Sequence, residues 1–139
     1  MAYQFINIES TAMISFIGLG YFVVIMILMH KLRPDYNPRS CYISEYAVGK
    51  YGRLAASSFV LYGLGILGIC LCLHTVLTTR VQSNIGLTLM AIWGVAVIIT
   101  SFFNTDLKAE QMSLHGTVHT IAANIGVAIV CASSNIIIF

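Results

Sequence analysis

The chain has 139 residues, of which 58% are hydrophobic and 9% are charged, and its formal net charge is +2. An ordinary soluble domain has about 25% charged residues, so this composition excludes a soluble enzyme, a disordered chain and a protein that binds nucleic acid. The class that remains is a single integral membrane domain over residues 1–139.

Four apolar runs are each long enough to cross a hydrocarbon core of about 30 Å as a helix, at about 1.5 Å per residue. Backbone groups at membrane depth need internal partners, and the runs lack the alternation of a barrel strand, so helices are favoured. The first run lacks the basic n-region of a signal peptide, and we expect it to be retained. The sequence therefore predicts an all-α fold, a transmembrane four-helix bundle, with spans at about 10–29, 54–77, 85–103 and 117–139.

The basic residues are distributed unevenly between the connections. Of the seven Lys and Arg residues, only Arg80 falls in the turn between the second and third spans. The others lie in the first and third connections, which four spans place on one side of the membrane: Lys31, Arg33, Arg39, Lys50, Arg53 and Lys108. The positive-inside rule predicts that these two connections are cytoplasmic and that both termini lie outside the cytoplasm.

The first connection, residues 30–53, is the longest polar segment and contains both prolines, Pro34 and Pro38. Proline is favoured at a helix start, and two glycines interrupt the chain before the second span. Between them, residues 40–48 are expected to form a short interfacial helix. In the third connection, Thr105 is the predicted N-cap of a further short helix before the fourth span.

Small residues inside the spans predict where the helices pack. Three glycines match the dinucleotide pattern G-x-G-x-x-G, but that motif needs a strand and an accessible turn, neither of which exists inside a bilayer. We interpret them as packing positions, because apolar helices associate through close approach at small residues. The positions are Gly63, Gly65 and Gly68, the stripe Ser58, Gly65 and Cys72, and the stripe Ala122, Gly126 and Ser133.

The uncommon polar residues gather in the two connections that share a side. Asp106, His115 and His119 lie in or beside the third connection, and Ser44 and Glu45 lie in the first. His119 falls just inside a span, where an ionisable group is costly and usually faces a polar interior. We predict His119, Asp106 and Glu45 as catalytic candidates, with His119 as the acid or base and an acidic residue orienting it.

Further residues of the same two connections are candidates for binding. Ser44, His115 and Arg39 are predicted to contact a ligand. His115 and His119 are four residues apart, one helical turn, so they could also ligate a divalent metal. The glutamate of H-E-x-x-H is absent between them, which disfavours a zincin.

Structural roles for the same residues stay open. Asp106 could cap a helix near its N-terminus, where negative charge is favoured. Glu45 could pair with Arg53 or Lys50, and His115 could be an interfacial residue exposed to water.

A haem is a less expected cofactor than a divalent metal. His30 and His74 end the first and second spans on opposite sides of the membrane. Haem ligation by two histidines requires both at one depth, and the third span contains none.

Short motifs in both connections resemble those of a known family. The first connection reads YNPRS at 36–40 and ISEY at 43–46, followed by Gly49 and YG at 51–52. The third connection reads FNTD at 103–106, followed by G-x-x-H at 116–119 and a pair of alanines. The set resembles a family of small prokaryotic membrane proteins, domain of unknown function 998. The resemblance covers nearly the whole chain.

The resemblance implies a helical protein of the prokaryotic inner membrane and marks Ser44, Glu45, Asp106 and His119 as the site. It implies no activity. It also implies about six spans, whereas this chain has room for four. We therefore expect either a compact member or a bundle completed by another copy or a partner.

Three functions are compatible with these observations. The first is a polar site at one membrane face that binds or processes a membrane lipid or small amphiphile, with or without a metal. The second is a non-catalytic subunit or scaffold of a larger membrane complex. The third is a haem or quinone carrier.

Overall fold

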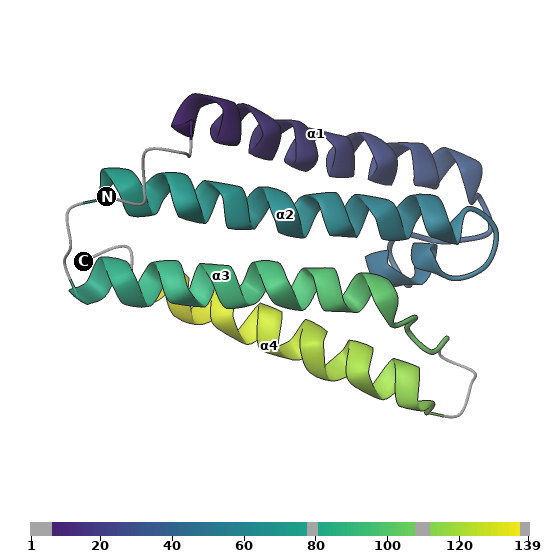
Figure 1. The fold of residues 1–139 in the computed structure, drawn as a ribbon. Coiled ribbons are helices and arrows are strands. Elements are labelled where there is room, and N and C mark those ends of the chain that lie inside the picture. Colours follow the sequence, from purple (N-terminus) through teal and green to yellow (C-terminus); the bar gives the residue numbers. More distant parts are fainter. Residues whose placement is uncertain (1–6, 78–80, 108–111, 137–139) are drawn as a thin grey trace.

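The chain folds into four long helices and one short one (Figure 1). The computed structural model describes residues 7–77, 81–107 and 112–136. The helices are α1 (Ile8–Leu32), η2 (Ile43–Ala47, a 3₁₀ helix), α2 (Gly52–Val76), α3 (Val81–Phe102) and α4 (Leu114–Ile136). Each α-helix contains a stretch long and apolar enough to cross a membrane. The predicted all-α four-helix transmembrane bundle is confirmed, and the protein is an integral membrane protein.

The helix bounds differ modestly from the predicted spans. Polar residues at the membrane surface extend α1 to Leu32 and start α4 at Leu114, beyond the apolar runs that defined the spans. The last predicted residues of the fourth span, 137–139, lie outside the described residues. The same holds for Arg80, for Lys108 and for the side chain of Ser133.

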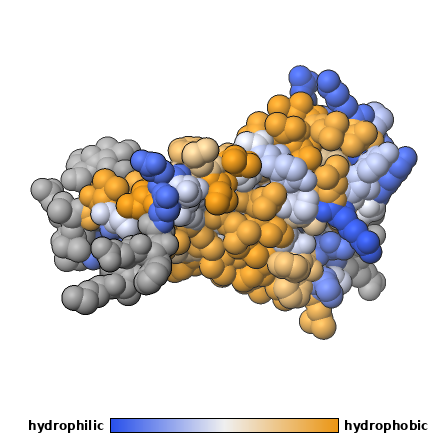
Figure 2. Space-filling model, turned by 45° about the horizontal axis from the view of Figure 1, so that its top comes forward, coloured by the Kyte–Doolittle hydropathy of each residue, from blue (hydrophilic) through white to orange (hydrophobic). Residues whose placement is uncertain are grey.

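The helices pack in chain order. α1 packs on α2, α2 on α3 and α3 on α4, so that α1 and α4 form opposite edges of the arrangement (Figure 1). Both the α1–α2 connection and the segment that follows α3 lie at the end where η2 packs on α2. We call this the η2 end. Figure 2 shows hydrophilic residues mainly at this end and an apolar surface over the middle of the visible face.

Glycines bring the helix backbones into close contact. A Cβ added at Gly63 would lie 2.6 Å from the carbonyl oxygen of Gly94 in α3. In α1, a Cβ on Gly18 would lie 2.7 Å from the carbonyl oxygen of Leu61, and one on Gly65 would lie 2.9 Å from that of Ser15. These contacts confirm that the glycine-rich segment of α2 is a packing surface, on two faces of the same helix.

The predicted interfacial helix of the first connection is present but shorter than residues 40–48. Tyr46 of η2 is 2% exposed and packs among Ile25, Met26 and Met29 of α1. The chain enters α2 through a left-handed residue, Tyr51 (φ 65°). A Cβ at the next position, Gly52, would overlap the carbonyl oxygen of Ala47. This glycine is therefore needed for η2 to dock on α2.

The N-cap predicted at Thr105 is wrong. Residues 103–107 form no helix. The first turn of α4 is instead capped by Ser113, whose Oγ accepts from the backbone N–H of Gly116 at 3.0 Å. A short helix further along the connection would fall partly at 108–111, outside the described residues.

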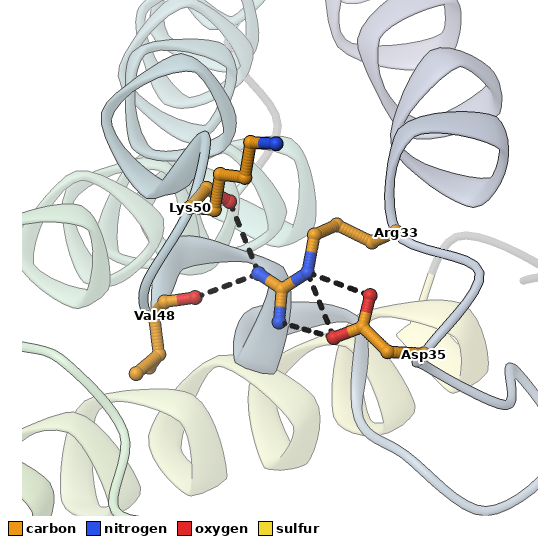
Figure 3. Close-up of polar contacts among 4 residues, drawn as sticks. All are labelled: Arg33, Asp35, Val48 and Lys50. Atoms are coloured by element: carbon orange, nitrogen blue, oxygen red, sulfur yellow. Dashed lines mark hydrogen bonds and ion pairs between the residues drawn. The ribbon is translucent and has the colours of Figure 1, made fainter.

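Arg33, directly after α1, ties the first connection together (Figure 3). Its Nη1 donates to the backbone oxygens of Val48 at 2.9 Å and Lys50 at 3.0 Å. Its Nε and Nη2 donate to the Asp35 carboxylate at 2.9–3.1 Å. The guanidinium is 4.2 Å from the centre of the Tyr36 ring. The bonds to Asp35 raise the pKa of Arg33 and lower that of Asp35.

Replacing Gly63 with Ala should destabilise the bundle by about 1–3 kcal/mol, because the new methyl group would overpack the α2–α3 contact. Gly20→Ala and Gly86→Ala are matched controls, since a Cβ at either position meets nothing within 4 Å. Thermal unfolding in detergent measures the difference. An equal change in Tm for all three variants would contradict the close-contact interpretation.

Replacing Arg33 with Lys should loosen the first connection, since a single ammonium group cannot hold Asp35 and two carbonyl oxygens in the planar geometry of a guanidinium. Two carbonyl oxygens lose their donor, at a cost of about 1–3 kcal/mol. Hydrogen exchange of residues 33–51 should become faster. The same change at exposed Arg53 should leave this exchange as it is, and equal behaviour of the two variants would refute the role of Arg33.

Candidate functional site

An interhelical cavity of about 540 Å³ lies between the two edges of the helix arrangement. Its walls come from η2, from Thr105 and from all four α-helices. Four aromatic side chains form much of the wall contributed by the first three α-helices: Phe22, Phe59, Tyr62 and Trp93. Tyr62 and Trp93 also carry a hydrogen-bonding group, and the other polar lining residues are Tyr42, Ser44, Thr100, Thr105, His119, Thr120 and Asn124.

The cavity runs from the η2 end into the depth of the bundle. Ser44 and Thr105 line it at that end, and Val127 lines it on α4. Val127 is about 20 Å along the axis from Leu114, at about 1.5 Å per residue. The cavity is therefore long enough for a molecule with a polar head and an apolar tail.

The aromatic wall is a connected series of rings. Phe22 of α1 stacks on Tyr62 of α2 with ring centres 4.5 Å apart, and meets Phe59 edge-on at 5.3 Å. Tyr62 meets Trp93 of α3 edge-on at 5.9 Å. Such pairs favour fixed ring orientations, so this side of the cavity is preformed.

His119 connects the fourth helix to the end of the third. Its side chain is 5% exposed, and its Nδ1 contacts the backbone oxygens of Phe103 at 2.7 Å and Thr100 at 3.2 Å. Both partners are acceptors only, so Nδ1 must carry the proton and donate. The last carbonyl groups of a helix have no partner within it, which explains why α3 offers these acceptors.

The other ring nitrogen, Nε2, is left to the cavity. Within the described part of the chain it has no hydrogen-bond partner, while the ring itself lines the cavity. With Nδ1–H held in place, neutral His119 presents Nε2 as an acceptor of fixed direction. This is the arrangement expected of a histidine that binds a ligand or acts as a base.

Asp106 is engaged at the start of α4. Its two carboxylate oxygens accept from the backbone N–H of Ser113 at 2.7 Å and from the Ser113 hydroxyl at 2.6 Å. These bonds lower the pKa of Asp106. A Cβ at Gly116 would overlap the carboxylate. The glycine of the G-x-x-H motif therefore leaves room for Asp106, which positions the helix that carries His119.

Glu45 is engaged in the first connection. It is 5% exposed, and its Oε1 accepts from the backbone N–H of Tyr42 at 3.0 Å, which caps η2. Its neighbour Ser44 lines the cavity, whereas Glu45 does not. The sequence left open an ion pair of Glu45 with Arg53 or Lys50. In the structure, the carboxylate instead contacts the backbone of Tyr42.

The predicted site residues are therefore brought together only in part. Ser44 and His119 line one cavity from separate connections, as expected from their shared side. Asp106 and Glu45 lie behind that surface as helix caps. His115 is exposed with its ring 5.4 Å from that of Phe103, and Arg39 is exposed.

The geometry of the described residues gathers no metal or haem ligand set. Among them, no group of three or more His, Cys, Asp or Glu side chains is placed to hold a metal ion. His30 and His74 lie at opposite ends of the bundle, and Nδ1 of His30 contacts the backbone oxygen of Met26 at 2.6 Å.

Sequence reasoning missed the deep polar lining of the cavity, namely Tyr62, Trp93 and Asn124. An asparagine within an apolar run is a usable signal, because polar groups in spans usually face an interior. The orientations of Tyr62 and Trp93 depend on how the helices rotate, which no sequence pattern showed. Ser113, directly before an apolar run, was a recognisable N-cap.

Comparison with known proteins identifies a family. The family model described as Protein of unknown function (DUF998) matches residues 16–137. Neither the curated proteins nor the solved structures contain a match to this chain. The match extends from α1 to the last residues of α4, and so includes every described residue that lines the cavity.

Acidification should release the Asp106 cap. The pKa of Asp106 is lowered in the folded state, so its stabilising effect is complete above its unfolded pKa, about 3.9, and disappears as pH falls through the lower folded value. The amide proton of Ser113, followed by NMR in detergent, should titrate with a midpoint below about 3.9.

Two variants check the assignment of that titration. Asp106→Asn should abolish it, and Asp35→Asn should leave it unchanged. A midpoint at or above the value of a free aspartate would show that the cap is absent.

Proposed function

We propose a function from the premise that the chain belongs to the DUF998 family and is a multi-pass membrane protein of unknown function. The protein binds a membrane lipid or another small amphiphile in the interhelical cavity, with the polar head near His119. The single observation that supports this proposal is the cavity itself, aromatic along one wall and polar where His119 presents Nε2.

The size and lining of the cavity agree with such a ligand. Ligand sites are concave, mostly apolar, largely preformed and furnished with a few fixed polar groups, with volumes of about 300–1,000 Å³. A lipid head at the level of Ser44, Thr105 and His119 would lie near the membrane surface. Its tail would follow the aromatic wall toward Val127.

We also propose that the η2 end faces the cytoplasm of a prokaryotic inner membrane. The described basic residues near this end are Lys31, Arg33, Arg39, Lys50 and Arg53. The positive-inside rule assigns such an end to the cytoplasm and places both termini on the other side.

Catalysis at His119 is the second candidate function. The carbonyl groups of Thr100 and Phe103 hold one tautomer, which leaves Nε2 able to accept a proton from a bound head group. In this proposal Asp106 and Glu45 are positioning residues, since each caps a helix. Neither proposal needs a metal at His115 and His119.

A role as a subunit of a larger membrane complex is the alternative. The edges formed by α1 and α4 do not pack on each other, and another copy or a partner protein could cover the face between them. In that case the purified protein should carry a partner at fixed stoichiometry, with no dependence of lipid content on His119.

The lipid proposal predicts that wild-type protein, purified in mild detergent, retains a lipid detectable by native mass spectrometry. His119→Asn keeps a side-chain N–H for the α3 carbonyls but lacks Nε2, and should lower lipid affinity about tenfold, the loss expected for one hydrogen bond of about 1.4 kcal/mol.

His115→Asn is the matched control, because His115 lies on the same helix but does not line the cavity. It should retain lipid as the wild type does. Wild-type protein without any bound lipid would contradict the proposal, as would equal lipid loss in the two variants.

A further inference from the structure

The polar groups of the cavity are all uncharged side-chain types if His119 is neutral. Among the described lining residues there is no Asp, Glu, Lys or Arg. The basic residues nearest in sequence, such as Arg39, Lys50 and Arg53, are exposed and belong to the surface of the η2 end rather than to the cavity. A charged head group inside the cavity would thus meet no opposite charge from the lining, at a depth where burying an ion is costly.

Three hydrogen-bonding groups lie in the deeper part of the cavity. They are the phenol of Tyr62, the indole N–H of Trp93 and the side-chain amide of Asn124. In the described part of the chain, none of the three has a hydrogen-bond partner, and Tyr62 and Trp93 are partly exposed while Asn124 is exposed. At membrane depth, water is scarce and an unsatisfied polar group is costly. These groups require a partner that the helices themselves do not provide.

Together with His119 Nε2, these groups define the chemistry of the missing partner. The indole N–H donates, neutral Nε2 accepts, and the phenol and amide do both. A hydroxyl group donates to Nε2 and accepts from the indole N–H, and a carbonyl group accepts from the indole, phenol and amide; neither adds charge. A phosphodiester, like a carbonyl, offers Nε2 no donor, and it also brings a negative charge that no described lining residue balances.

The cavity also opens sideways to the bilayer. Asn124 and Val127 line it from α4, yet both are exposed on the molecular surface. Phe22 lines it from α1 at the opposite edge of the arrangement, and α1 and α4 do not pack on each other. A hydrophobic molecule can therefore reach the cavity from the membrane interior without passing through water.

From these observations we infer that the occupant is an uncharged lipid whose head carries a hydroxyl or carbonyl group, and that it enters from the bilayer between α1 and α4. This inference rests on the proposed function and specifies its ligand class. Two sources share this chemistry, a glycerol-based neutral lipid and an isoprenoid quinone or quinol.

The test measures which lipids the full-length protein retains. Purified protein is incubated in detergent with equal amounts of dioleoylglycerol, ubiquinone, dioleoylphosphatidylglycerol and dioleoylphosphatidylcholine, and the complexes are counted by native mass spectrometry. At least one of the two uncharged lipids should exceed both phospholipids by tenfold or more, and which of them does so identifies the source.

Two pairs of variants locate that binding in the cavity. Ala123→Leu narrows the cavity and should strongly reduce retention of the uncharged lipid, whereas Ala128→Leu, on an exposed part of α4 outside the lining, should not. Trp93→Phe keeps an aromatic ring in the wall but removes the indole N–H and part of the ring volume, and should lower occupancy about tenfold. If Ala123→Leu fails to fold, the lipid occupancy of Trp93→Phe relative to the wild type provides the test instead.

The two proposals fail in different ways. Binding of phosphatidylglycerol at or above the level of the uncharged lipids, lost in His119→Asn, would overturn the inference about charge and leave the proposed function standing. Retention of none of the four lipids would overturn both. Equal occupancy in Ala123→Leu and Ala128→Leu would place the bound lipid outside the cavity and overturn the inference.

Discussion

Backbone contact at glycine is the constraint on which the rest of the structure depends. Inside a membrane, burying apolar side chains against neighbouring helices contributes little, so helices are held by close approach and by polar contacts. α2 uses Gly65 and Gly68 against α1 and Gly63 against α3. These contacts fix the rotation of α3, and therefore place Trp93 on the side where α4 passes it at Gly126. The cavity is the space left where the first and last helices do not meet.

The ends of the helices determine what lines the mouth of that cavity. Because two spans separate the first and third connections, both emerge at the same end, where η2 docks on α2. His119 donates a hydrogen bond to a carbonyl group at the end of α3 that has no partner within the helix. Asp106 accepts one from the backbone N–H of Ser113 at the start of α4. The same polar residues thus stabilise the helix ends and leave one imidazole nitrogen facing the cavity. In the proposed function, the structural role of His119 and its role in ligand binding coincide.

The sequence predicted the features that follow from hydropathy and from the number of spans: an all-α bundle, the shared side of the two connections, and Ser44 and His119 as neighbours of one space. The sequence did not predict the features that depend on how each helix is rotated about its axis or on close packing between two residues. Glu45 and Ser44 are adjacent, and only the docking of η2 determines which one faces the cavity. Asp106 needs the absence of a side chain at Gly116, and no residue pattern alone shows that the two meet. In the sequence, Trp93 and Tyr62 resemble ordinary apolar positions of their helices. Only the glycine contacts determine which face of each helix points toward the cavity.

Photochemical labelling with a lipid in vesicles tests most directly whether the space between α1 and α4 holds a membrane molecule. A dioleoylglycerol analogue and a ubiquinone analogue, each with a diazirine in the apolar chain, would be activated by light and the labelled residues identified by mass spectrometry. The account predicts labelling concentrated at Trp93, Ala123 and Val127, and reduced by an excess of the unlabelled lipid. Labelling spread evenly over outward-facing residues such as Ile14 and Ile17, with no competition, would contradict it.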